Sequence, residues 1–270
     1  MSEAKALPTG NAETVTNEDY EKLLARAAAR PGDPVLRAQV AIAAEPERVD
    51  EALNQAIVVT RTCLELGIVD LAHEAAAMLS LHFAYQPDVG VLMADVLLQQ
   101  SAGQAIDEVR RLLESIVAEH PDAVDARIRV AALSLGLGEI DAARRWIEPV
   151  YGTTSETRGL YVQTLLAAGA IDEAADVAAA GLQREDASGL LHQLLGIAEL
   201  SRGRVDAAIG ALSEALRLAP EDPVAYYNLA LAFEASGSRL AGLGVCDAGL
   251  DLAPQDPRLL ALRERLALRP

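Results

Sequence analysis

Aromatic residues are scarce in this chain of 270 residues, in which phenylalanine, tryptophan and tyrosine together make up only 3%. Alanine, in contrast, accounts for about one residue in five. Alanine is the best helix former and its small side chain lets helices approach closely, so the composition favours stacked helices over a sheet. The hydrophobic fraction of 51% excludes general disorder.

Cysteine is also scarce, and long apolar runs are missing. The two cysteines, Cys63 and Cys246, lie far apart, so reduced thiols in a cytoplasmic protein are a simpler interpretation than a disulfide framework. No run approaches the roughly 20 apolar residues that a membrane helix needs. The segment from Met1 to Thr16 has no apolar core after basic residues, so we expect neither a secretory signal nor membrane insertion.

Positive charge is in short supply as well. The formal net charge is −17, which argues against nucleic acid and anionic membranes as partners, because both are bound by basic patches. The same charge mildly favours basic partners. Lysine occurs only at Lys5 and Lys22, and this bias towards arginine together with the alanine excess fits a GC-rich bacterial genome.

The segment from Gly189 to Asp256 contains two consecutive copies of one sequence unit. Matched positions lie 34 residues apart: Leu195-Gly196 with Leu229-Ala230, Gly203 with Gly237, Ala208 with Gly242, Ala215 with Gly249, and Pro220-Glu221-Asp222 with Pro254-Gln255-Asp256. Fixed self-similarity at this period is the signature of a helical repeat array, in which each unit buries its apolar face against its neighbours.

The pattern resembles the tetratricopeptide repeat, a helix-turn-helix unit. The large-x-x-Leu-Gly centre of its first helix is His192-x-x-Leu195-Gly196 here, and becomes Tyr226-x-x-Leu229-Ala230 in the next copy. The resemblance implies an all-α fold, a right-handed superhelical α-solenoid. It also implies that partners bind in a concave groove lined by the first helix of each unit.

Tracing the repeat along the chain predicts its organisation. The predicted segments are a disordered tail at 1–16, an N-terminal helical extension at 17–52, a degenerate unit at 53–89, five units at 90–123, 124–154, 155–188, 189–222 and 223–256, and a C-terminal capping helix at 257–270. The unit at 124–154 is short because Pro149 truncates its second helix. Since curvature is the sum of rotations between units, we predict a kink or a break there.

The resemblance also indicates which residues face the groove. The predicted partner-binding residues are Gln163, Leu190, Gln193, Ile197, Tyr227, Asn228 and Leu231, and the same spacing selects Val91, Ala94 and Leu98 in an earlier unit. The full row of groove-facing positions also includes Asp125, Ile128, Ala132, Glu156, Gly159 and Val224. Its last third is uncharged or apolar, which favours capture of an amphipathic helix or an extended peptide by apolar burial. The alternative is that these residues pack against a neighbouring second helix or against the terminal helix.

Some members of the family hold a C-terminal carboxylate with a clamp of lysine and asparagine. Asn228 lies beside the predicted groove, but no lysine occurs in the array to accompany it. The resemblance therefore does not extend to this clamp.

The sequence predicts no catalytic, cofactor or metal site. His73-Glu74 begins like a zinc-protease motif, but Ala77 replaces its second histidine. Four scattered histidines and two distant cysteines form no metal cluster. Gly242-Leu243-Gly244 resembles a phosphate loop only superficially, because it lies in a predicted second helix and no Gly-Lys-Ser/Thr follows it.

We therefore predict a non-enzymatic cytoplasmic adaptor or scaffold that binds a peptide or helix of a protein partner. Three alternatives stay open. The chain could bind itself and form a homo-oligomer, serve as a non-catalytic regulatory subunit of a larger enzyme, or act as a chaperone of the tetratricopeptide type.

Overall fold

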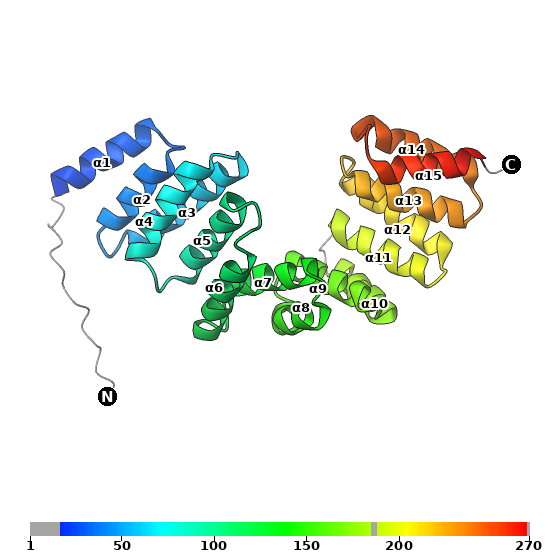
Figure 1. Cartoon of the computed structure of the whole chain (residues 1–270), viewed down its shortest axis with the longest axis horizontal. Coiled ribbons are helices and arrows are strands. Elements are labelled where there is room, and N and C mark those ends of the chain that lie inside the picture. The colour runs from blue at the N-terminus through cyan, green and yellow to red at the C-terminus, as the bar shows by residue number, and fades with distance from the viewer. Residues whose placement is uncertain (1–16, 185–187, 269–270) are drawn as a thin grey trace. The chain divides into compact units, whose positions relative to one another are not determined.

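The computed structural model describes residues 17–184 and 188–268, and this part of the chain contains fifteen α-helices, one 3-10 turn and no strand (Figure 1). The tail predicted at 1–16 lies outside the described residues. The elements are α1 (Asn17–Ala29), α2 (Pro34–Ala43), α3 (Val49–Glu65), α4 (Val69–His82), α5 (Pro87–Gln100), α6 (Ile106–Glu119), α7 (Val124–Gly136), α8 (Ile140–Ile147), η1 (Glu148–Val150), α9 (Ser155–Ala167), α10 (Ile171–Leu182), α11 (Gly189–Ser201), α12 (Val205–Leu218), α13 (Pro223–Ala235), α14 (Arg239–Leu252) and α15 (Pro257–Leu268).

Glycines in a left-handed conformation end the first helix of most helix pairs. Their φ angles lie between +74° and +76° at Gly67, Gly138, Gly169, Gly203 and Gly237. Other L residues rarely adopt this conformation, which is why glycine commonly follows the end of a helix. After Gly203, the amide of Arg204 donates to the carbonyl of Glu199 at 2.9 Å. This hydrogen bond ends α11 just before α12 begins. The glycine that recurs in each pair therefore fixes the turn between the two helices.

The chain divides into two compact units, Met1–Arg129 and Val130–Pro270. The division lies within α7 rather than at Pro149, where the sequence predicts a break. Pro149 does shorten its helix: α8 ends at Ile147 and the proline lies in the 3-10 turn η1.

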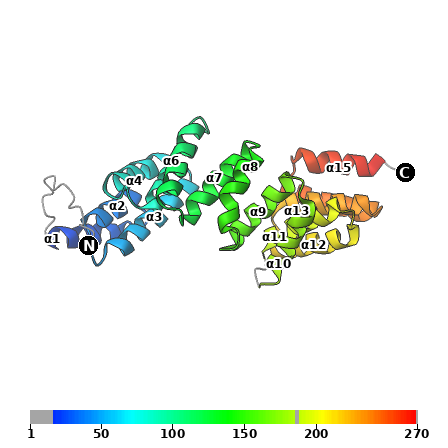
Figure 2. The same ribbon diagram turned by 90° about the horizontal axis from the view of Figure 1, so that it is seen from below.

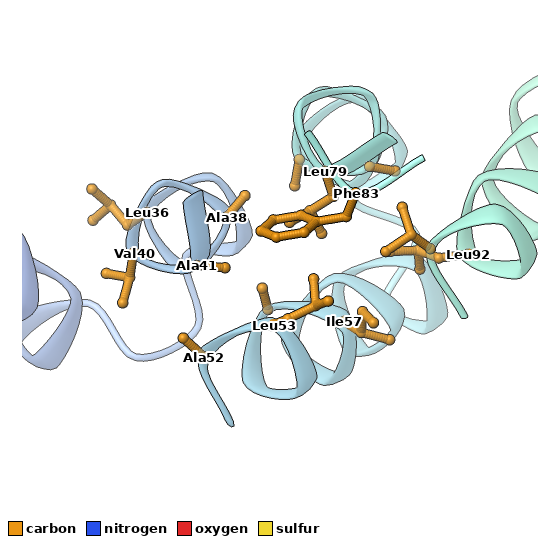
Figure 3. Close-up of a cluster of buried hydrophobic side chains, with 14 of the residues drawn as sticks. Leu36, Ala38, Val40, Ala41, Ala52, Leu53, Ile57, Leu79, Phe83 and Leu92 are labelled. Carbon is orange, nitrogen blue, oxygen red and sulfur yellow. The ribbon is translucent and has the colours of Figure 1, made fainter. Parts of the chain in front are cut away.

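The core of unit Met1–Arg129 lies between α2, α3 and α4 (Figure 3). The ring of Phe83, which follows α4, points towards Ala38 and Ala41 of α2, with Leu53 of α3 nearby. All four side chains are buried. Small alanines on α2 leave the space that the phenylalanine ring fills, so the three helices form one core.

In unit Val130–Pro270, helix pairs pack through small residues. A Cβ atom added to Gly196 of α11 would overlap the side chain of Leu212 on α12, so the glycine sets how closely this pair approaches. The terminal helix α15 lies against both α13 and α14 (Figures 1 and 2). Its leucines Leu259, Leu262 and Leu266 are buried there.

Candidate functional site

One set of exposed side chains runs across the first helices of unit Val130–Pro270. The second residues of α9, α11, α13 and α15 are Glu156, Leu190, Val224 and Arg258, which are spaced 34 apart in the sequence. Helix α11 lies against both α9 and α13, and α13 also lies against α15. The four residues, which we call the first-turn row, are all exposed. Its middle is apolar, with Leu190 exposed by 41% and Val224 by 37%.

A glycine on α9 holds one end of this row in place. A Cβ atom added to Gly159 would lie 2.9 Å from Cδ2 of Leu190, so the leucine side chain rests on the bare backbone of α9. Glu156 precedes Gly159 by three residues and therefore shares its helix face. This places Glu156 on the side of α9 that also meets Leu190.

Side chains cap the helices that carry the row. Oγ1 of Thr154 accepts from the amide of Thr157 at 3.1 Å, and Oγ of Ser188 accepts from Leu191 at the same distance. The carboxylates of Asp222 and Asp256 cap α13 and α15 in the same way. The first turns are thereby fixed and part of their amide groups is satisfied.

Gln193, a predicted groove residue, is buried with 7% exposure. Its Nε2 donates to Oδ2 of Asp222 at 3.0 Å, while Oδ1 of the same aspartate accepts from the amide of Val224 at 2.9 Å. The glutamine thus links α11 to the start of α13, and its side chain leaves little surface for a partner.

Tyr227 and Leu231 pack against the cluster that α15 forms with α13 and α14. The guanidinium of Arg258 lies 5.6 Å from the centre of the Tyr227 ring, close enough for a cation–π contact. Arg265 of α15 also pairs with Glu234 of α13 at 2.6 Å. Both residues are half buried, so part of each side chain packs against this cluster and part stays accessible.

The remaining predicted groove residues are half buried. Gln163 and Ile197 are each seven residues, about two turns, beyond the first-turn row on α9 and α11. Asn228 on α13 is half buried as well. Among the seven predicted partner-binding residues, Leu190 alone is exposed, and it lies in the row.

In unit Met1–Arg129, the predicted register of α5 is wrong. Val91 and Ala94 are fully buried instead of lining a groove, because α5 begins at Pro87, earlier than the repeat boundary at Gly90 suggests. Leu98 is half buried and borders a hollow of about 390 Å³.

This hollow is charged, and sequence reasoning missed its residues. Arg129 pairs with Asp95 through two contacts of 2.8 and 3.2 Å, and Arg61 lies 3.6 Å from Asp125. Arg61, Asp95 and Arg129 line the hollow and follow one another at 34-residue intervals. That spacing was the signal that could have identified them.

The described residues contain no group of three histidine, cysteine, aspartate or glutamate side chains placed to hold a metal ion. Both cysteines are free thiols and buried. Burial raises the pKa of each thiol, with the carboxylates of Asp33 beside Cys63 and Asp247 beside Cys246 adding to the rise. The thiols therefore lack the lowered pKa of a reactive cysteine. None of the helices in the described part of the chain is long and apolar enough to cross a membrane.

Comparison with known proteins identifies the repeat. The family model described as TPR repeat matches residues 196–237. No curated protein matches the sequence. Among solved structures, a thermophilic TPR protein of Thermus thermophilus has 21% identity and a TM-score of 0.54 over 67% of this chain and 97% of that one. A tetratricopeptide repeat protein of Parabacteroides merdae has 12% identity and a TM-score of 0.64 over 93% of this chain and 100% of that one.

Two further solved structures have a similar fold. The hetero-tetramer Cut9-Hcn1 of APC/C has 14% identity and a TM-score of 0.68, covering 93% of this chain and 46% of that one. YrrB, described as a TPR protein with an unusual peptide-binding site, has 13% identity and a TM-score of 0.51 over 71% of this chain and 99% of that one. The resemblance noted in the sequence is thus confirmed: residues 196–237 match the tetratricopeptide repeat, and the chain has the all-α fold of tetratricopeptide repeat proteins.

Proposed function

We propose that this protein is a non-enzymatic cytoplasmic scaffold that binds a peptide or helix of a protein partner across the first helices of unit Val130–Pro270. Its fold is one that serves protein interaction in general. The observation that carries the proposal is the exposed apolar pair Leu190 and Val224, at equivalent positions on neighbouring helices. Exposed apolar side chains that gather on one face of a protein mark a candidate interaction site.

The test is capture of partners from the native lysate by the wild-type chain and by a Leu190→Glu, Val224→Glu double variant, read by mass spectrometry. The variant places two charges on the apolar pair without touching the cluster under α15. We expect it to lose the partners that the wild type recovers.

A Leu240→Glu variant serves as the matched control, because Leu240 on α14 is exposed by 77% and lies outside the row. This variant should recover the wild-type partners. If the double variant also recovers them while remaining folded by circular dichroism, the row is not the binding surface.

A further inference from the structure

We propose that the first-turn row binds a basic amphipathic segment of a partner protein. Apolar side chains of the partner cover Leu190 and Val224, and a lysine or arginine of the partner pairs with Glu156. This inference rests on the function proposed above and adds the chemistry of the partner.

The charges around the apolar pair are mainly negative. The Glu156 side chain is exposed and has no ion-pair or hydrogen-bond partner among the described residues. Asp222 adds a carboxylate next to Val224. At the other end of the row, Asp256 already neutralises Arg258, with Nη2 to Oδ2 at 2.7 Å and Nε to Oδ1 at 3.2 Å. A cation from a partner therefore meets an uncompensated carboxylate beside an apolar surface.

The opposite charge preference has one physical argument in its favour, because first turns of helices attract anions. Here, however, capping side chains already accept hydrogen bonds from first-turn amides in all four helices that carry the row. The caps of α13 and α15 are carboxylates, from Asp222 and Asp256, so they offset the positive end of the helix dipole. A basic segment fits this surface better than an acidic one.

The spacing of the row defines a suitable probe. Axes of packed neighbouring helices lie about 8–10 Å apart, and a helix rises by about 10.5 Å over seven residues while returning to nearly the same face. A synthetic helix with a lysine and two leucines at seven-residue intervals can therefore place the lysine near Glu156 and the leucines on Leu190 and Val224. A control peptide carries glutamate in place of that lysine.

Fluorescence anisotropy with both labelled peptides on the full chain tests the proposal. We expect the lysine peptide to bind more tightly than the glutamate peptide. Glu156→Gln should lower the affinity for the lysine peptide by about twofold to fivefold, which is the effect of one exposed charge pair. Leu190→Ala should lower the affinity for both peptides by about fivefold or more, because apolar burial is lost.

Asp206→Asn is the control for general attraction to an acidic chain, since Asp206 is an exposed acid in the first turn of α12, outside the row. It should leave the affinity for the lysine peptide nearly unchanged. Equal weakening by Asp206→Asn and Glu156→Gln, or tighter binding of the glutamate peptide, overturns the inference. So does self-association in analytical ultracentrifugation that Val224→Glu abolishes, because a second copy then covers the row.

The two proposals fail in different ways. If the Leu190→Glu, Val224→Glu variant loses its lysate partners while Glu156→Gln binds the lysine peptide as the wild type does, the row is a binding surface but its partner is not selected by positive charge. If neither experiment depends on the row, both proposals are wrong.

Discussion

Asp222 connects two neighbouring first helices, and its replacement by alanine should destabilise unit Val130–Pro270 by about 2–4 kcal/mol. Two contacts are lost. Oδ1 no longer accepts from the Val224 amide at 2.9 Å, which removes the cap of α13 and costs about 1 kcal/mol. Oδ2 no longer accepts from Nε2 of Gln193 at 3.0 Å. That leaves a donor on a 7% exposed side chain without its partner and costs a further ~1–3 kcal/mol.

A double-mutant cycle separates the two contributions. We expect Asp222→Ala to cost only about 1 kcal/mol in a Gln193→Ala background, because only the cap is then removed. Asp222→Asn keeps a carbonyl oxygen for the Val224 amide, and the Gln193 amide can turn to present its oxygen to the new NH₂ group. This variant should therefore cost less than about 1 kcal/mol. Urea unfolding followed by circular dichroism measures the free energy of unfolding of every variant.

The cycle also decides what Gln193 does. Strict additivity of the two alanine substitutions would refute the coupling between Gln193 and Asp222. If Gln193→Ala leaves unfolding unchanged but abolishes partner capture, the side chain is a binding residue, as the sequence predicts, and not a structural link between α11 and α13.

Two further perturbations test the packing and the electrostatics of the same unit. Gly196→Ala should lower the free energy of unfolding by about 1–3 kcal/mol, because its Cβ atom overlaps Leu212. Gly210→Ala lies in α12 with no atom within 4 Å of the new Cβ atom, so it should raise the free energy of unfolding by about 0.5–1 kcal/mol. Urea unfolding in which both variants change the stability in the same direction contradicts this packing. The guanidinium of Arg258 is the main reason that the pKa of Asp256 falls from 3.8 to about 2. The ionised Asp256 carboxylate therefore contributes its full stabilisation above pH 3.8, and this stabilisation is lost as the pH falls towards 2. Arg258→Ala should flatten the stability profile of this acid range, and an unchanged profile would show that the pair does not couple to folding.

The helix pairs were predictable because local signals define them. Glycines such as Gly203 and Gly237 recur at the repeat period and adopt the left-handed conformation that ends a helix. The register of α5 was predicted incorrectly because Pro87 starts the helix before Gly90, where the repeat period alone would place the unit boundary. A proline at the first helical position is a stronger local signal than the period.

The candidate site could be predicted only in part, because exposure depends on residues distant in sequence. Gln193 occupies a groove position by spacing, yet Asp222 on the next helix pair binds its amide. Tyr227 occupies the equivalent position on α13, yet α15 packs against it and Arg258 lies over its ring. Leu190 remains exposed because nothing in the described residues covers that part of its side chain. Spacing gives the helix face, but the neighbours decide what stays accessible.

A comparison of equivalent positions explains why the first-turn row carries the functional argument. Five residues after each turn glycine, the second helix has a small buried residue in every pair of unit Val130–Pro270, at Ala143, Ala174, Ala208 and Gly242. Close packing between helices requires this uniformity. At the second position of α9, α11, α13 and the terminal helix α15, in contrast, the residues are glutamate, leucine, valine and arginine, all exposed. Packing restricts these exposed positions less than it restricts the small buried ones, so this is a surface where the sequence can specify a partner with little effect on the fold.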